Sequence, residues 1–473
     1  MGAFISHFSA GLINVALPDI ALQFTQPLKQ TQWLVTGYLL IIMITLPLFG
    51  KLSDMYGKRR IHNTGYLVFT IATILAAISS SIFTLLVFRI LQAIGAAMLQ
   101  ASNMGILSAM FEPGKRGKAL GFLGMSVSIG GLLGPSVGGL VMEWFSWPIL
   151  FWIQLPFLVA AMYLAHNYIP HDEKKDRKPF DTTGMLLFSF SMTSFVLAFS
   201  FIENMEQLFL PIMILVGCSI ASFYIFTRHS QKRKNPIIEF TFLALPLVRA
   251  GIIINIVSFI ATFSVLVALP FFFRGVLAIS TAVAGLIIMC YPVSMAITGP
   301  ISGTLSDRFG PNKITSIGLG IMLLSLVGMS SLSPTSPLSY VMLHLCLLGI
   351  AMGMVTSPNY SLIMSYIPPT YSGMIGSFIA LCRNLGMLVG TTLGLTMINV
   401  WIPGSITDWM SGNPFDATIN QVLLGFRSLF WMIAAATLFS LVYFLYIQKV
   451  ETMSTKQKEK KNDTTKKGSL KRA

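Results

Sequence analysis

The chain has 473 residues, of which 54% are hydrophobic and only 10% are charged. Its mean hydropathy is +0.74. A soluble globular protein covers its surface with about a quarter charged residues, so this composition excludes a set of soluble domains. The net charge of +15 resides mainly in short loops and in the C-terminal tail. That distribution is typical of membrane orientation and argues against nucleic-acid binding.

Apolar runs long enough to cross a bilayer as helices follow one another along most of the chain. The first run starts beside Met1, and we expect an uncleaved helix rather than a signal peptide. We predict fourteen spans, at residues 3–23, 32–50, 61–80, 83–110, 118–141, 148–168, 182–203, 208–227, 250–273, 280–303, 314–332, 338–366, 372–402 and 425–447.

The basic residues predict the orientation of these spans. With Met1 inside, 27 of the 32 lysines and arginines fall in inner loops or in the tail. The tryptophans fall near the outer ends of the spans, where indole rings prefer the headgroup level. We therefore predict a multi-pass protein of the cell membrane with both termini in the cytoplasm.

One polar motif, G-x-L-S-D-x-x-G, occurs at 50–57 and again at 303–310, after the second and the tenth spans. Equivalent placement indicates an internal parallel repeat, with spans 7 and 8 as an inserted pair. The predicted domains are an N-terminal six-helix half, a linker with two extra transmembrane helices, a C-terminal six-helix half, and a basic cytoplasmic tail without regular structure that lies against anionic lipid. Their boundaries are 1–168, 169–248, 249–448 and 449–473.

The segment GKLSDMYGKRR (50–60) resembles the signature loop between helices 2 and 3 of the major facilitator superfamily. Fourteen spans, NVALP at 14–18 and the Phe180-Asp181 pair resemble its drug:proton antiporter branch. The resemblance implies an all-α integral membrane protein with the major facilitator fold, built from two six-helix halves plus two inserted central helices. It further implies alternating-access export of amphipathic drugs or toxic compounds in exchange for protons. We expect a monomer without cofactor or metal.

The repeated motif predicts a tight inner turn with glycines where backbones approach or φ turns positive. Its aspartate can cap a helix or pair with a cation. Two interpretations stay open, a topology anchor and a charge latch that holds one conformation. The latch residues would be Gly50, Asp54, Gly57, Lys58, Arg59, Asp307 and Arg308.

Arg89 lies inside the fourth predicted span, with Gln92 one turn later. A guanidinium in hydrocarbon is costly and points to function, and the resemblance links this arginine to proton movement. The alternative is a structural arginine bonded to carbonyls of neighbouring helices.

The fifth predicted span carries SIGGLLGPSVGG at 128–139. Glycines four residues apart share one helix face and let another helix approach closely, while a proline bends the helix. The string resembles the antiporter motif of exporters in the superfamily and so implies export. The residues concerned are Gly130, Gly134, Pro135, Gly138 and Gly139. A second stripe, at Gly386, Gly390 and Gly394, is explained by ordinary helix packing.

All seventeen acidic residues lie in loops, in the tail or near span ends. Related antiporters carry an aspartate where this chain has Ser9, which weakens the case for cation export and for proton coupling. Asp19 is a candidate proton carrier, although a solvated carboxylate at the outer end explains it as well. Histidine as a residue type titrates near physiological pH, which makes His7 and His344 candidates, but each is explained by a bond to a neighbouring helix.

Asn14, Trp33 and Tyr38 are candidates for lining the path of a small-molecule substrate. The scarcity of membrane acids, together with Arg89 and Arg383, supports an alternative function. This is export or facilitated passage of a neutral or anionic metabolite without proton antiport, although packing also explains Arg383. Because the chain lacks H-E-x-x-H and Walker motifs, we expect no enzyme activity.

Overall fold

The computed structural model describes residues 1–112, 115–172, 179–202, 205–401 and 416–470. Within these ranges the chain forms helices and turns, without a β-strand. The long helices are α1 (Gly2–Gln23), α3 (Trp33–Tyr56), α4 (Lys58–Ala77), α5 (Ile82–Met110), α6 (Arg116–Trp144), α8 (Leu155–Tyr168), α9 (Thr182–Ser200), α10 (Met205–Lys232), α11 (Pro246–Phe271), α13 (Cys290–Phe309), α14 (Pro311–Met329), α15 (Leu338–Ser365), α16 (Ser372–Trp401) and α18 (Asp416–Leu470). The short helices are α2 (Leu28–Thr31), α7 (Ile149–Trp152) and α12 (Thr281–Ile288), with single turns at Phe240–Ala244, Phe272–Val276 and Pro369–Tyr371.

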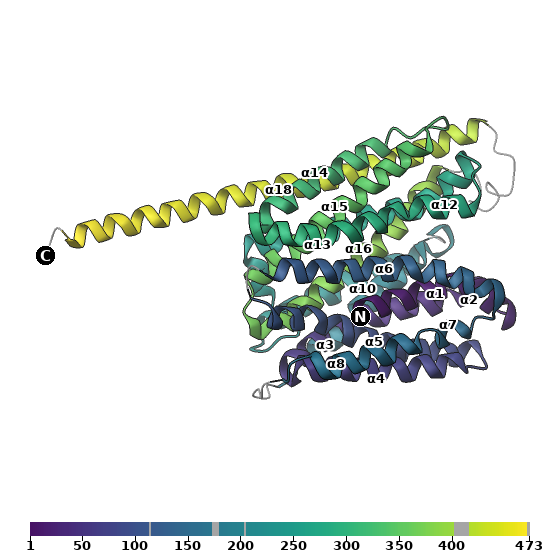
Figure 1. The fold of residues 1–473 in the computed structure, drawn as a ribbon, viewed down its shortest axis with the longest axis horizontal. Helices are drawn as coiled ribbons and strands as arrows, with labels where there is room; N and C mark the ends of the chain where they lie inside the picture. Colours follow the sequence, from purple (N-terminus) through teal and green to yellow (C-terminus); the bar gives the residue numbers. More distant parts are fainter. Residues whose placement is uncertain (113–114, 173–178, 203–204, 402–415, 471–473) are drawn as a thin grey trace.

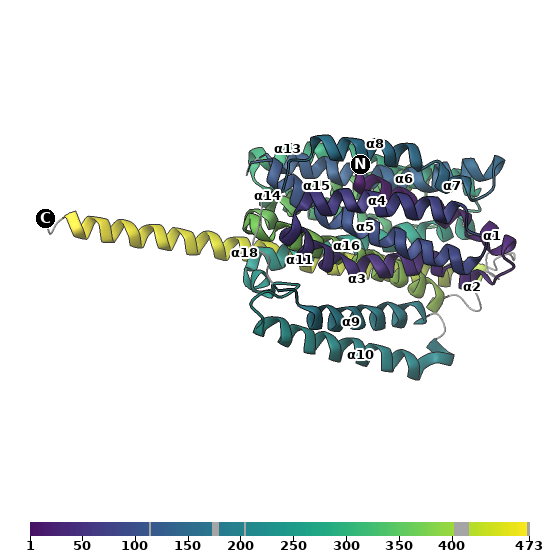
Figure 2. The ribbon, with the colours of Figure 1, turned by 90° about the horizontal axis from the view of Figure 1, so that it is seen from below.

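Thirteen helical segments of the described chain are long and apolar enough to cross a membrane. They coincide with thirteen of the fourteen predicted spans, two of which are broken near their start, into α7 with α8 and α12 with α13. The remaining predicted span, the third one at 61–80, corresponds to α4, whose first turn carries Lys58, Arg59 and Arg60. These charges explain its lower hydropathy, but α4 packs along α5 like the other helices of the bundle (Figure 2). The predicted all-α membrane fold is confirmed.

The bundle divides into two sets of helices, α1–α8 and α11–α18. The largest apolar core cluster lies within the second set, and another lies within the first set. The inserted pair, α9 and α10, forms a separate layer beside the bundle (Figure 2), where α9 packs against α3. Two serines join the pair, because the Ser191 and Ser219 hydroxyls each donate to the other's carbonyl oxygen at 3.0 Å.

Large apolar side chains are exposed on the outside of many helices. Among them are Phe83, Trp144, Leu210 and Phe439, each more than half exposed. A water-soluble protein rarely exposes so much contiguous apolar surface, whereas a bilayer solvates it. Many polar residues of the spans lie inside instead, including Arg89, Gln92 and Arg383.

Helix α18 extends far beyond the end of the bundle (Figure 1). It runs without interruption from the last membrane span into the basic tail, as far as Leu470. The prediction of a tail without regular structure is therefore wrong for residues 449–470, because the helix of the span continues into them.

Candidate functional site

The two copies of the repeated motif form matching turns at one end of the bundle. This end, which carries Asp54 and Asp307, is called the latch face below. Helix α3 ends at Tyr56 and α4 begins at Lys58, so only Gly57 separates them, with φ of +106°. Gly310, with φ of +90°, separates α13 from α14 in the same way. Side chains rarely adopt such φ values, which is why glycine stands at both turns.

The two motif aspartates bind helix N-termini in the opposite half of the molecule. Asp54 accepts hydrogen bonds from the backbone N–H groups of Gly373 at 2.9 Å and Met374 at 2.7 Å, in the first turn of α16. Asp307 accepts from Gly117 at 2.9 Å and Lys118 at 3.0 Å, in the first turn of α6. The first N–H groups of a helix lack partners within it and carry the positive end of its dipole. Each carboxylate therefore satisfies two such groups across the boundary between the halves.

Glycines allow these helix ends to meet. A side chain at Gly50 would collide with Ser377, and one at Gly303 would collide with the carbonyl oxygen of Gly117. Ser357 of α15 also donates to that carbonyl, at 2.7 Å. The two halves are thus in direct backbone contact at the latch face, and the structure is closed at this end.

The basic residues of the motif lie around the two caps. Lys58 donates to the hydroxyl of Ser372, immediately before Gly373 in α16. The Arg59 guanidinium donates to the carbonyl of His166, at the end of α8. Arg308 is exposed and lies over the ring of Phe309. Lys58 thus joins the contact between the halves, whereas Arg59 binds within its own half.

A third carboxylate at the latch face was missed from the sequence. Asp172 accepts hydrogen bonds from the backbone N–H groups of Arg59 at 3.0 Å and Arg60 at 2.9 Å, in the first turn of α4. Its side chain lies against Gly57. Among the residues that the structure describes, none lies within 4 Å of where a side chain at Gly310 would stand, so no equivalent of Asp172 is seen at that turn. The one sequence signal was that Asp172 is the first acid after the sixth span.

The glycine stripes fix the positions of the two capped helices within their own halves. Along α6, side chains at Gly130 and Gly134 would collide with carbonyl oxygens of α1, and Pro135 packs on Gly11. Gly138 also faces α1, whereas Gly139 has nothing within 4 Å. Helix α16 packs on α11 in the same manner through its stripe, at Gly386, Gly390 and Gly394. Each capped helix therefore presents small residues to the first helix of its own half.

Arg89 is fully buried and lies between α1, α3 and α5. Its guanidinium donates to Gln92 Oε1 at 2.6 Å, to Ser9 Oγ at 3.3 Å and to the carbonyl of Leu34 at 3.3 Å. It also stacks over Tyr38, 4.2 Å from the ring centroid, a favourable position for a cation. Its Nη2 atom has no hydrogen-bond partner among the described residues. Ser9, which stands at the position of the missing aspartate, thus contacts this arginine through a neutral hydroxyl.

A second polar chain connects the halves deeper in the bundle. Arg383 of α16 donates from Nη2 to Gln100 Oε1 of α5 at 2.8 Å, and Gln100 donates to Ser6 Oγ of α1 at 2.9 Å. The Tyr360 hydroxyl of α15 also lies at Arg383 and donates to Asn255 Oδ1 at 3.2 Å. The sequence did not single out Gln100 or Tyr360, because nothing in a single glutamine or tyrosine marks a partner on another helix.

Other candidate residues lie apart from these networks. Asp19 and Asn14 are exposed on α1, Asp19 near its end away from the latch face, and Trp33 is half-buried at the start of α3. His7 is an exception, because its Nδ1 lies 3.3 Å from Ser6 Oγ of the second polar chain as well as 2.9 Å from the carbonyl oxygen of Ala3. His344 bonds the carbonyl of Tyr340 within its own helix. No cluster of three or more metal-binding side chains occurs among the described residues.

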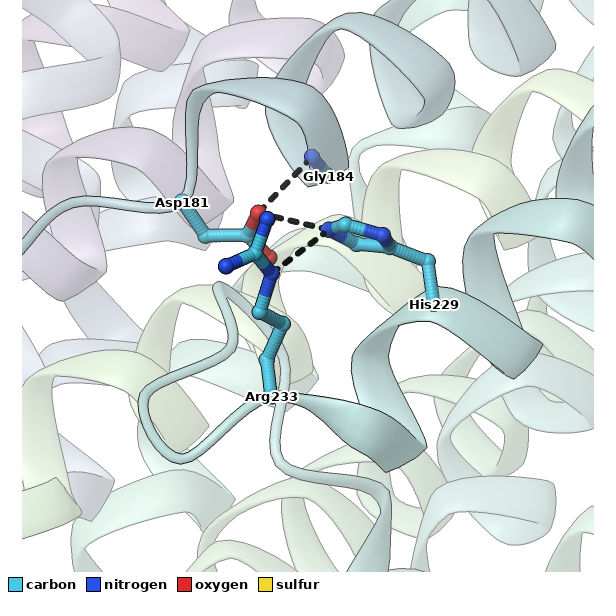
Figure 3. Close-up of polar contacts among 4 residues, drawn as sticks. All are labelled: Asp181, Gly184, His229 and Arg233. Carbon is cyan, nitrogen blue, oxygen red and sulfur yellow. Dashed lines mark hydrogen bonds and ion pairs between the residues drawn. The ribbon is translucent and has the colours of Figure 1, made fainter.

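The inserted pair is tied together near the latch face by a buried acid (Figure 3). Asp181 Oδ1 accepts from the Gly184 N–H at 3.0 Å, which caps α9, and lies 2.8 Å from His229 Nε2 at the end of α10. Arg233 Nε lies 3.4 Å from the same histidine nitrogen. Because the carboxylate is an acceptor, the bond at 2.8 Å places a proton on His229 Nε2.

The repeated halves, crossed helix caps and buried arginines define the class of the protein, a helical membrane transporter. A model of the Major Facilitator Superfamily matches residues 1–391. The chain therefore belongs to the major facilitator superfamily, whose members are secondary transporters of small molecules.

Proteins of similar sequence match most of the chain. It is 32% identical to the riboflavin transporter RibZ of Clostridioides difficile over 95% of this chain and 96% of the relative. It is 27% identical to the tetracenomycin C resistance and export protein of Streptomyces glaucescens, over 89% and 78%. The solved structure of the proton:xylose symporter XylE has the same fold, with a TM-score of 0.66, 14% identity and coverage of 94% and 93%.

Proposed function

We propose that the protein is a secondary active transporter that exports amphipathic drugs or toxic compounds by alternating access, in exchange for protons. The crossed caps at the latch face carry this proposal. Asp54 and Asp307 each hold a helix of the opposite half, so the latch face opens only when four charge-assisted hydrogen bonds break. Interactions with two discrete arrangements are what a conformational switch requires. Gly50 and Gly57 shape the contact, with Lys58, Arg59 and Arg308 around it.

The direction of transport is proposed from α6. Gly130, Gly134, Pro135 and Gly138 form its packing face toward α1, and the string resembles the antiporter motif of exporters. Relatives named for drug resistance support this direction, among them the tetracenomycin C resistance and export protein. Asn14, Trp33 and Tyr38 remain candidates for contact with the substrate, although Tyr38 is buried under Arg89.

Proton exchange is proposed to involve Arg89, Gln92 and Asp19. Buried charged groups without full compensation are typical of transport pathways, and Arg89 is held by neutral partners with one nitrogen unpaired. A change in the charge of a nearby group would therefore strongly change the electrostatic energy of the Arg89 guanidinium.

A second candidate function is export or facilitated passage of a neutral or anionic metabolite without proton antiport. It is favoured by Ser9, because the hydroxyl contacting Arg89 does not ionise at physiological pH. The riboflavin transporter RibZ, 32% identical to this chain, makes riboflavin a natural test compound.

The cellular location is proposed from the distribution of the basic residues. We propose that the protein lies in the cell membrane as a monomer, with the latch face and both termini in the cytoplasm, where positive loops are retained.

Solute movement in liposomes tests the proposal. The full chain is reconstituted with a pH-sensitive dye inside, a pH gradient is imposed, and accumulation of rhodamine 6G and of riboflavin is followed with and without an uncoupler. We expect accumulation coupled to proton movement, and less of both in Arg89→Ala and Asp19→Asn. Arg249→Gln is the matched control, because Arg249 is exposed and bonds Tyr443 at 2.9 Å. Flux that ignores the uncoupler would establish the second candidate instead, and absence of flux for both compounds would refute transport.

A further inference from the structure

The polar chain through Arg383 joins the two halves at a distance from the latch face. Arg383 is the twelfth residue of α16, and Gln100 is ten residues before the end of α5. With a rise of about 1.5 Å per residue, both lie roughly 15 Å from the ends of their helices at the latch face. In a helix about 30 Å long, that is the middle of the bilayer.

The guanidinium of Arg383 is buried among neutral groups. Its side chain is 5% exposed, its Nη2 binds the amide oxygen of Gln100, and its Nε has no hydrogen-bond partner. Within the described residues, the groups that bond or face it include the Gln100 amide, the Tyr360 hydroxyl and the His7 ring, and Asn255 lies behind Tyr360. A buried charge is costly unless an opposite charge or several acceptors compensate it. The protein supplies one amide oxygen and one hydroxyl, and leaves a donor unused.

Within the part of the chain that the structure describes, the Arg383 guanidinium lacks hydrogen-bond acceptors that a ligand with two neighbouring oxygens would supply. A guanidinium presents its N–H donors as a planar fork that suits paired acceptors, as in a carboxylate. A cyclic imide offers one carbonyl oxygen at a time to the same donors, because its two carbonyls lie on either side of an N–H group and point apart. Tyr360 and Arg383 belong to one half of the molecule, and Gln100 belongs to the other.

We propose that Arg383, with Gln100 and Tyr360, binds an oxygen acceptor group on the transported compound, either the oxygen pair of a carboxylate or a carbonyl oxygen of a cyclic imide. The bound group replaces the Gln100 oxygen on the guanidinium and fills the unused Nε donor. Because Gln100 and Arg383 belong to different halves, binding at this site changes a contact between the halves. This proposal rests on the proposed transport function for its biological meaning, but the binding can be tested without transport.

Fluorescence anisotropy of three probes in lipid nanodiscs tests the site on the full chain. Fluorescein supplies a carboxylate, riboflavin supplies a cyclic imide, and rhodamine 6G supplies a xanthene ring with its carboxyl esterified. We expect Arg383→Gln to weaken binding of fluorescein, riboflavin or both at least tenfold, while rhodamine 6G changes less than twofold. Loss for fluorescein alone identifies a carboxylate, and loss for riboflavin alone identifies an imide.

The controls separate recognition from folding. Arg249→Gln removes an exposed arginine and should bind all three probes like the wild type. Tyr360→Phe removes a single hydroxyl and should weaken the same probes as Arg383→Gln, by about threefold, even where Arg383→Gln does not fold. Arg383→Lys restores a positive charge and should recover part of the fluorescein affinity.

Three results would overturn the proposal. The wild type binds neither fluorescein nor riboflavin, the Arg383 and Tyr360 variants bind them unchanged, or a variant that melts like the wild type loses all three probes equally. Failure of the transport proposal is separate, because it shows as absence of flux in liposomes. Flux of a compound that binds independently of Arg383 would overturn only the recognition site.

Discussion

Replacing Asp54 with asparagine should shift the protein from the closed toward the open arrangement of the latch face. The Asp54 carboxylate, 9% exposed, accepts two backbone N–H bonds from α16, at 2.9 and 2.7 Å. Asparagine keeps one neutral acceptor and loses the charge. Hydrogen bonds to charged groups contribute about 1.5–3 kcal/mol and the helix dipole about 0.5 kcal/mol. The closed arrangement should lose about 2–3 kcal/mol, which shifts the ratio of closed to open molecules about 30- to 150-fold.

Spin-label distances across the latch face measure this shift. Labels are placed at Tyr56→Cys and Phe309→Cys, exposed positions at the ends of α3 and α13, in a chain whose native cysteines are replaced by alanine. We expect a longer distance population in Asp54→Asn than in the parent. Asp307→Asn should shift it less, because Asp307 is more exposed and its charge is better screened.

A matched acid controls for charge alone. Glu112 lies at the same face and pairs with Lys115 at 3.3 Å, with both side chains more than 70% exposed. Exposed pairs of this kind contribute little, so Glu112→Gln should leave the distances unchanged. Identical distance distributions for the parent and Asp54→Asn would refute the role of the helix cap, and equal shifts in the two aspartate variants would refute the difference between them.

Three further predictions concern single residues. Gly130→Ala should reduce transport at least tenfold, because its methyl group meets a carbonyl oxygen of α1. Gly139→Ala is the control and should transport normally, because that position has no neighbour within 4 Å among the described residues. Equal transport activities of the two variants would contradict this packing of α6 on α1. Gly57→Ala should lower the melting temperature more than Gly310→Ala, since both have positive φ but only Gly57 has a neighbour within 4 Å; the reverse order would count against this. Asp181→Asn should lower the free energy of unfolding by about 1–3 kcal/mol by weakening the tether of α9 to α10, and an unchanged denaturation midpoint would argue against that tether.

The helices and their order could be predicted because apolar length in a membrane is a local property of the chain. The turn glycines and the stripe of α6 were also readable, since positive φ and close helix approach require residues without side chains. The span at 61–80 was predicted from its apolar run, and the structure adds a basic turn in front of it, so that α4 begins at Lys58.

The partners of the polar residues could not be predicted. Asp54 binds Gly373, 319 positions away, and Gln100 binds Arg383, 283 positions away. Nothing local to an aspartate tells which helix N-terminus it will cap. The motif predicted that its aspartate caps a helix or pairs with a cation, and in the structure Asp54 caps a helix of the other half. Arg383, for which packing also offered an explanation, is one of the residues that bridge the halves.

The most direct test of alternating access is to lock the latch face. Lys58 of α4 and Ser372 beside the start of α16 are in contact across the halves. In the cysteine-free chain, Lys58→Cys and Ser372→Cys are joined by a short bis-methanethiosulfonate cross-linker, and flux of riboflavin and rhodamine 6G into liposomes is measured before and after reduction. We predict that the cross-link stops flux and that reduction restores it. Undiminished flux through the fully cross-linked protein would contradict the account.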